Sequence, residues 1–195
     1  MNICVYLSSS DAVAPHFVDL AIHLGREIGL RGHTLVFGGN NTGLMGRLAD
    51  AVKDNGGKVI GVVPQKLHDL GRSYTRCDQL IISRDLRDRK AIMDEHADAF
   101  VALPGGLGTL EEIIEVLNLK YLRYHQKPVV FINHRGFYNP LFSAFGSFYD
   151  ERFTKRAVEL LYAALPSIDD LFPYLETYKP VQVEEKWYDR STDAI

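Results

Sequence analysis

Six short apolar runs recur along this chain, and between them the apolar residues are spaced as in amphipathic helices. The runs at 59–63 and 100–103 are apolar throughout, as strands covered on both faces must be. Strands that alternate with helices become parallel neighbours in one sheet. The pattern therefore predicts an α/β fold, a Rossmann-like doubly wound parallel sheet, with strands at 3–7, 34–37, 58–63, 79–82, 99–103 and 129–132.

The length of the chain fits a single domain. With 195 residues, of which 46% are hydrophobic and 24% charged, it resembles an average globular protein built around one core. We expect the Rossmann-like domain to cover residues 1–178, with helical segments from 138 to 164 and from 167 to 178. Residues 179–195 are expected to form an extended C-terminal tail.

Composition narrows the possible partners. A net charge of −3 gives no general attraction to nucleic acid, so small anions are the expected partners. No apolar run approaches the roughly 18 residues of a membrane span, and no basic leader precedes the first strand. The two cysteines, Cys4 and Cys77, form no CxxC pair. We therefore expect a cytoplasmic protein with neither a nucleic-acid nor a membrane partner.

A glycine-rich turn follows the strand at 99–103 and leads into a helix that is expected to begin at Leu110. Glycines allow backbone N–H groups to approach a ligand closely, and a helix N-terminus adds unpaired donors and the positive end of its dipole. This combination predicts a phosphate site. Its candidate residues are Gly105, Gly106, Gly108 and Thr109.

Two further loops are expected to face this turn, because ligands of such sheets bind beyond the carboxyl ends of the strands. One is a second glycine turn that contains Gly39, and the other is the serine cluster around Ser9. Ser9 is a candidate donor to a phosphate or sugar, although serines after a strand are also common turn and N-cap residues.

Several familiar sites are missing from the sequence. The first loop lacks GxGxxG, which argues against NAD, and no Gly-Lys-Ser/Thr of a Walker loop is present. The seven histidines show no metal-ligand spacing, and no GxSxG elbow occurs. We therefore expect neither a metal nor a cofactor.

Two charged residues have an ordinary alternative interpretation. Thr109 and Glu112 have the spacing of a capping box, in which both would only start the helix. Arg89 lies in a charged run where an i,i+4 pair with Asp85 on a solvated helix face is the usual arrangement. Three glycines in four residues favour a binding loop, but spacing alone gives neither Glu112 nor Arg89 a chemical role.

The chain resembles the LOG ("lonely guy") family, the cytokinin riboside 5′-monophosphate phosphoribohydrolases. Arg89-Lys90, followed by the run from Pro104 to Glu112, looks like the family's PGGxGTxxE signature. The similarity extends over residues 3–175 and includes Gly43-Leu44-Met45-Gly46, Ala97-Asp98-Ala99-Phe100 and Lys127-Pro128-Val129. Members have been labelled lysine decarboxylases, but no feature of this sequence suggests a pyridoxal phosphate site.

This resemblance implies hydrolysis of the N-glycosidic bond of an N6-substituted AMP to free base and ribose 5-phosphate. It also implies a homodimer, or a larger assembly, with active sites near the subunit interface. Arg89 and Glu112 match the family's catalytic residues. The matches to nucleotide contacts are Lys90, Gly105, Gly106, Gly108, Thr109 and Asn118, the last of which stands where relatives often have threonine.

The chain departs from the family at two loops, since Asn40 replaces a usual third glycine and Leu7-Ser8-Ser9 replaces a Cys-Gly-Ser-type loop. These departures bear on substrate preference more than on reaction type. Two other functions stay open: a nucleotide or molybdenum-cofactor carrier without turnover, and a general AMP nucleosidase. The presence of both Arg89 and Glu112 favours catalysis, because a carrier needs no such pair.

Overall fold

The computed structural model describes residues 1–183, which form one sheet of parallel strands in the order β4-β3-β2-β1-β5-β6-β7. The chain winds outward from β1 in both directions, so the order reverses beside that strand. This confirms the predicted Rossmann-like doubly wound fold. The strands are β1 (Asn2–Tyr6), β2 (Thr34–Phe37), β3 (Lys58–Pro64), β4 (Gln79–Ser83), β5 (Ala99–Ala102), β6 (Val129–Ile132) and β7 (Ala163–Leu165).

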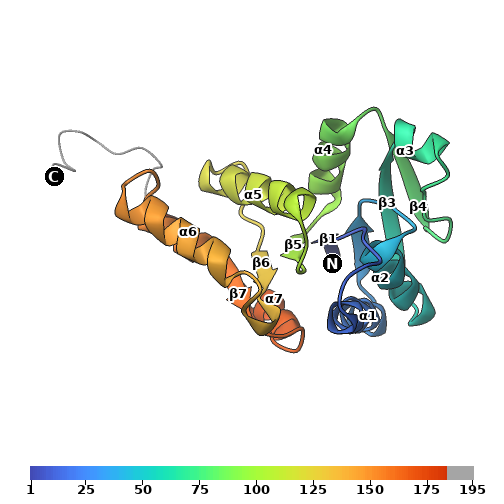
Figure 1. Cartoon of the computed structure of the whole chain (residues 1–195), viewed down its shortest axis with the longest axis horizontal. Coiled ribbons are helices and arrows are strands. Elements are labelled where there is room, and N and C mark those ends of the chain that lie inside the picture. Colours follow the sequence, from blue (N-terminus) through green and yellow to red (C-terminus); the bar gives the residue numbers. More distant parts are fainter. Residues whose placement is uncertain (184–195) are drawn as a thin grey trace.

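Helices cover both faces of the sheet, with α4 and α5 above it and α1 and α2 below it in Figure 1. No helix within residues 1–183 combines the length and apolar character that crossing a bilayer requires. The helices are α1 (Pro15–Leu30), α2 (Gly43–Asp54), α3 (Gln65–Asp69), α4 (Leu86–His96), α5 (Leu107–Tyr121), α6 (Asn139–Asp150) and α7 (Leu171–Thr177), with 3-10 turns η1 (His134–Gly136) and η2 (Arg156–Leu161).

The core has two layers, one on each side of the sheet. Along β1, Ile3 and Val5 pack towards α1 and α2, whereas Cys4 and Tyr6 pack towards α4 and α5. All four side chains are at most 2% exposed. Burial of an aliphatic side chain contributes about 1.5–3 kcal/mol, so both faces of the strand stabilise the fold. This two-sided burial explains why the strand runs are apolar without alternation.

The predicted helix from 138 to 164 is wrong in its second half. Helix α6 ends at Asp150, where the chain turns through Arg152 with a positive φ of 58°. The N–H groups of Phe153 and Thr154 both donate to the carbonyl of Phe148 and close the helix. The turn η2 and the edge strand β7 follow. Because β7 is short and alanine-rich, it carries no strand signal of its own.

The last predicted helix, 167–178, is present as the shorter α7. The chain then leaves regular structure, and the Val183 carbonyl accepts a hydrogen bond from Arg123 at 3.0 Å. The remainder of the predicted tail, 184–195, lies outside the described residues.

Candidate active site

The loops after β1, β2 and β5 surround a cavity of about 260 Å³ at the carboxyl edge of the sheet. The three loops therefore face one another as expected from the sequence. Among the predicted site residues, the cavity is lined by Ser9, Arg89, Gly106, Gly108, Thr109 and Glu112. Further lining residues that the sequence analysis missed are Tyr6, Met45 and Leu67. Leu67 follows the buried strand β3, so the carboxyl-edge rule could have found it.

Helix α5 begins at Leu107, three residues earlier than the periodic pattern indicates, and its N-cap is Gly106. Thr109 is therefore the third helical residue and Glu112 the sixth. A capping box requires the hydroxyl residue at the N-cap itself, and no side chain caps this helix. The capping interpretation is thus wrong, and the first-turn N–H groups lie free of side-chain caps beside the cavity.

The glycines of the α5 turn are required for space rather than for backbone conformation, since none of them has a positive φ. A Cβ atom on Gly105 would lie 2.2 Å from Oγ1 of buried Thr109. Gly105 thus lets Thr109 pack behind the loop. A Cβ atom on Gly106 or Gly108 would meet no atom within 4 Å, so these two glycines leave the cavity side open for a ligand.

Gly108→Ala is therefore expected to fold normally and to bind nucleotide poorly. Alanine favours the helix by up to about 1 kcal/mol, so Tm should hold or rise. The new methyl group would displace phosphate from the N–H groups, and losing one hydrogen bond to a charged group, about 1.5–3 kcal/mol, should raise the Kd for AMP at least about tenfold. Thermal melting and calorimetric titration measure both effects.

Gly105→Ala is the matched control, because its Cβ would collide with Thr109 in the free protein. It should lower Tm instead of acting on affinity alone. If the folded Gly108→Ala protein binds AMP tightly, the phosphate does not bind at this loop.

Gly39, a predicted site residue, is not among the residues that line the cavity. It has a positive φ of 64°, and a Cβ atom there would lie 2.3 Å from Cγ2 of Val63 on β3. Gly39 therefore packs against the sheet, and its neighbours Gly38 and Asn40 line the cavity. A Cβ atom on Gly38 would lie 2.8 Å from a guanidinium nitrogen of Arg89, so Gly38 makes room for that side chain.

Arg89 forms an ion pair with Glu112 across the cavity wall, which brings α4 and α5 together. The pair with Asp85 is wrong, because the Asp85 carboxylate caps α4 by accepting from the N–H groups of Arg87 at 2.8 Å and Asp88 at 2.9 Å. Nε of Arg89 is buried and has no hydrogen-bond partner within residues 1–183. Arg89 also lines the cavity, so its side chain lies beside any group bound there.

The Glu112 carboxyl is held in a low-dielectric position, with the residue only 8% exposed. Burial raises its pKa above the ordinary glutamate value, and the positive charge of Arg89 opposes that rise. Arginine stays protonated throughout the accessible pH range, so it favours the ionised carboxylate at neutral pH. The arrangement places a desolvated carboxylate next to an anion-binding helix terminus.

Lys90 and Asn118 do not line the cavity of about 260 Å³. The Lys90 ammonium forms ion pairs with Glu111 and Glu115. It borders a neighbouring hollow of about 330 Å³ that also contacts Gly108 and Glu112. Lys90 and Asn118 both line the groove between α5 and α6. Within the described part of the chain, no group of three or more His, Cys, Asp or Glu residues is arranged to hold a metal ion.

Comparison with known proteins gives both a family and a fold. Residues 45–175 match the family model described as possible lysine decarboxylase. The chain is 38% identical over 180 residues to cytokinin riboside 5′-monophosphate phosphoribohydrolase LOG5 of Arabidopsis thaliana, covering 92% of this chain and 79% of that protein. It is 39% identical to LOG4 of the same plant, covering 92% and 83%.

Among solved structures, the molybdenum cofactor carrier protein of Chlamydomonas reinhardtii superposes with a TM-score of 0.68 at 22% identity, covering 90% of this chain and 95% of that one. The molybdenum cofactor binding protein of Rippkaea orientalis gives 0.66 at 21% identity, with coverage of 90% and 95%. At these identities the likeness shows a shared fold. The sequence relatives and the family model carry the family assignment, and the chain belongs to the LOG family of cytokinin riboside 5′-monophosphate phosphoribohydrolases.

Proposed function

We propose that this protein hydrolyses the N-glycosidic bond of N6-substituted adenosine 5′-monophosphate and releases the free base and ribose 5-phosphate. The observation that carries the proposal is the Arg89–Glu112 pair, whose side chains are 14% and 10% exposed and which faces the same cavity as the N-terminal turn of α5. The relatives named above are phosphoribohydrolases of cytokinin riboside 5′-monophosphates, and they cover nearly all of this chain.

The phosphate is assigned to the first turn of α5, where Gly106, Gly108 and Thr109 line the cavity. Unpaired N–H groups and the helix dipole favour an anion there. Binding energy from this non-reacting group then positions the C1′–N bond beside Glu112. Arg89 lines the same cavity, so its guanidinium supplies a further donor to the phosphate or to the ribose.

Glu112 is assigned to the sugar, because cleavage develops positive charge at C1′ and a desolvated carboxylate stabilises it strongly. The electron pair of the C1′–N bond leaves with the base, which takes up a proton. A water molecule forms the new C1′–O bond and loses a proton, so the hydrolysis is balanced. Glu112 orients this water and accepts its proton.

A panel of nucleotides with chromatographic detection of free base tests the function. N6-isopentenyl-AMP should release its base faster than AMP does, and adenosine, which lacks the phosphate, should react poorly. Binding without release of base would show a carrier. Cleavage of AMP at least as fast as of the prenylated nucleotide would show a general AMP nucleosidase.

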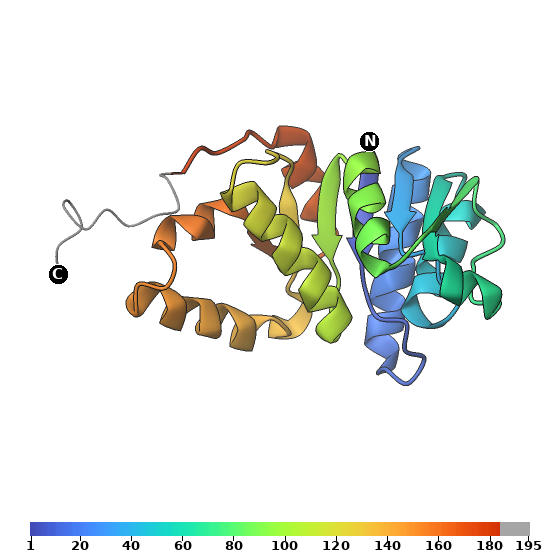
Figure 2. The same cartoon turned by 90° about the horizontal axis from the view of Figure 1, so that it is seen from above.

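We further propose that the protein is a cytoplasmic homodimer joined through the groove between α5 and α6. Figure 2 shows these two helices diverging, and the groove between them has a volume of about 850 Å³. Its lining is mainly apolar and includes Leu107, which is 86% exposed, and Phe148, which is 47% exposed. Exposed apolar side chains gathered in one groove are typical of an interaction site. The two free cysteines, Cys4 and Cys77, fit a reducing compartment.

Phe148→Lys is expected to dissociate this dimer, because it places a charge in the apolar groove. Sedimentation should show the wild-type protein at twice the 22.0 kDa chain mass and the variant as a monomer. Leu30→Lys, at an exposed position on the other face of the sheet, should remain a dimer. A Phe148→Lys protein that stays dimeric would place the interface elsewhere.

A further inference from the structure

The oxygen and the nitrogen of the Asn40 side-chain amide have different surroundings. Its Oδ1 accepts hydrogen bonds from the Thr42 N–H at 3.0 Å and from Thr42 Oγ1 at 2.9 Å. A backbone N–H can only donate, so this turn identifies the oxygen end of the amide. The Nδ2 group makes no hydrogen bond to any of residues 1–183, and Asn40 lines the cavity that holds Glu112. The amide therefore offers a donor with no acceptor in the described protein.

The backbone around Asn40 is held by the segment from 71 to 74. Asn40 forms an antiparallel bridge with Ser73. On either side of it, the Gly39 carbonyl accepts from the Tyr74 N–H at 2.8 Å, and the Asn41 N–H donates to the Arg72 carbonyl at 3.0 Å. These contacts clamp the glycine turn from outside the cavity.

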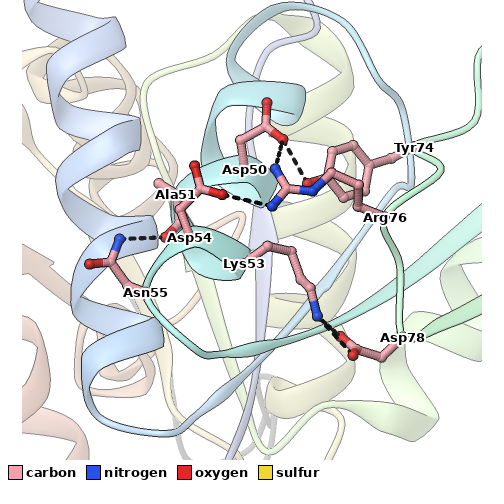
Figure 3. Close-up of polar contacts among 8 residues, drawn as sticks. All are labelled: Asp50, Ala51, Lys53, Asp54, Asn55, Tyr74, Arg76 and Asp78. Carbon is pink, nitrogen blue, oxygen red and sulfur yellow. Dashed lines mark hydrogen bonds and ion pairs between the residues drawn. The ribbon is translucent and has the colours of Figure 1, made fainter.

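The clamp is anchored to α2 by the polar contacts in Figure 3. The Tyr74 hydroxyl donates to Asp50 at 2.8 Å, and Arg76 bridges Asp50 at 2.8 Å and Asp54 at 2.7 Å. Lys53 binds Asp78, which follows this segment just before β4. Because a donor that is already positioned loses little entropy on binding, this support favours a role for Asn40 in recognition.

The position of Asn40 indicates which part of a nucleotide it meets. The loop after β2 and the loop after β5 lie on opposite sides of β1, so Asn40 faces the α5 turn across the cavity. Gly38, in the same loop, lies against the Arg89 guanidinium. With phosphate on α5 and C1′ beside Glu112, as in the proposed function, the ribose lies within the cavity that Asn40 lines.

We propose that Asn40 is a specificity-determining residue whose Nδ2 group donates a hydrogen bond to a ribose hydroxyl of the bound nucleotide. The inference rests on the proposed function for the identity of the ligand. A glycine at this position would offer no side-chain donor. This chain should consequently discriminate ribonucleotides from deoxyribonucleotides more strongly than a variant without the amide.

The test combines Asn40→Gly with AMP, 2′-deoxy-AMP and 3′-deoxy-AMP. Loss of one hydrogen bond should lower kcat/KM for AMP about fivefold, while the nucleotide that lacks the partner hydroxyl should lose nothing further. Comparing variants on each substrate cancels the different intrinsic lability of the deoxyribosyl bonds. Asn40→Ser, whose hydroxyl can still support the turn, repeats the measurement if the glycine variant folds poorly.

Three outcomes overturn the inference. Equal losses on all three nucleotides would show that Asn40 only supports the loop, and unchanged activity on all would show no contact. A loss that disappears only with 3-deaza-AMP or 7-deaza-AMP, each of which lacks one ring-nitrogen acceptor, would direct Nδ2 to the base. If no nucleotide is hydrolysed, the same comparison by calorimetric binding tests Asn40 separately from the reaction.

Discussion

Glu112→Gln is expected to lower kcat for nucleotide hydrolysis by roughly 10³-fold, the scale of losing a positioned base and a charge that stabilises the transition state. The amide keeps the size of the side chain but cannot accept the proton of the water or balance positive charge at C1′. KM should change little, because the phosphate contacts on α5 remain. Initial rates of base release measure both constants.

The same substitution leaves the Arg89 guanidinium without its carboxylate, so a lower Tm is expected as well. Breaking a buried pair costs up to about 3–5 kcal/mol, and rates must be compared at a temperature where both proteins are folded. Glu95→Gln, at an exposed position on α4, is the matched control and should keep wild-type turnover. Full activity of folded Glu112→Gln would exclude the proposed mechanism.

Arg89→Met is expected to lower kcat at neutral pH by roughly 10²-fold and to shift the acid limb of the pH profile to higher pH. Burial already raises the pKa of Glu112, and Arg89 is the leading charge that opposes the rise. Without it the pKa rises further. Because activity requires the ionised carboxylate, activity is lost as pH falls through that higher pKa. The profile of kcat against pH measures the shift.

The stability of the fold should also depend on pH through the pKa of Glu112. A carboxyl whose pKa is higher in the folded than in the unfolded state stabilises the fold most below its unfolded pKa, and this contribution is lost as pH rises through the folded pKa. The Tm difference between wild type and Arg89→Met should therefore widen towards neutral pH. Arg89→Lys keeps the charge and should keep the acid limb. An unmoved limb in Arg89→Met would show that another group controls the Glu112 pKa.

The strands and the loops of the site were predictable because each rests on a strong local signal. Strands buried on both faces carry uninterrupted apolar runs, and their carboxyl ends gather at one edge of the sheet. The three-residue edge strand β7, in contrast, contains Ala163-Ala164-Leu165 and pairs only with β6. Its position depends on tertiary pairing, which leaves no mark on so short a run.

Side-chain direction was harder to predict than loop position. Glycines have low helix propensity, so Gly106 and Gly108 led to a predicted start of α5 that is too late in the sequence. With that later start, Glu112 fell at the capping-box position. The Asp85 carboxylate could pair with Arg89 or accept hydrogen bonds from the backbone at the start of α4, and in the structure it makes the backbone bonds. Asn118 lies six residues after Glu112, about 240° around the helix, and so lines a different surface.

Helix α5 lies at a shared boundary, since its first turn and Glu112 line the cavity while Leu110, Ile114 and Leu117 line the groove against α6. Ile113 and Val116 pack into the core. Few positions of this helix are thus free to vary neutrally. A substitution on the groove face of α5 is therefore expected to move the helix that carries Glu112. In the proposed dimer, contact with the partner subunit would help to hold Glu112 in position.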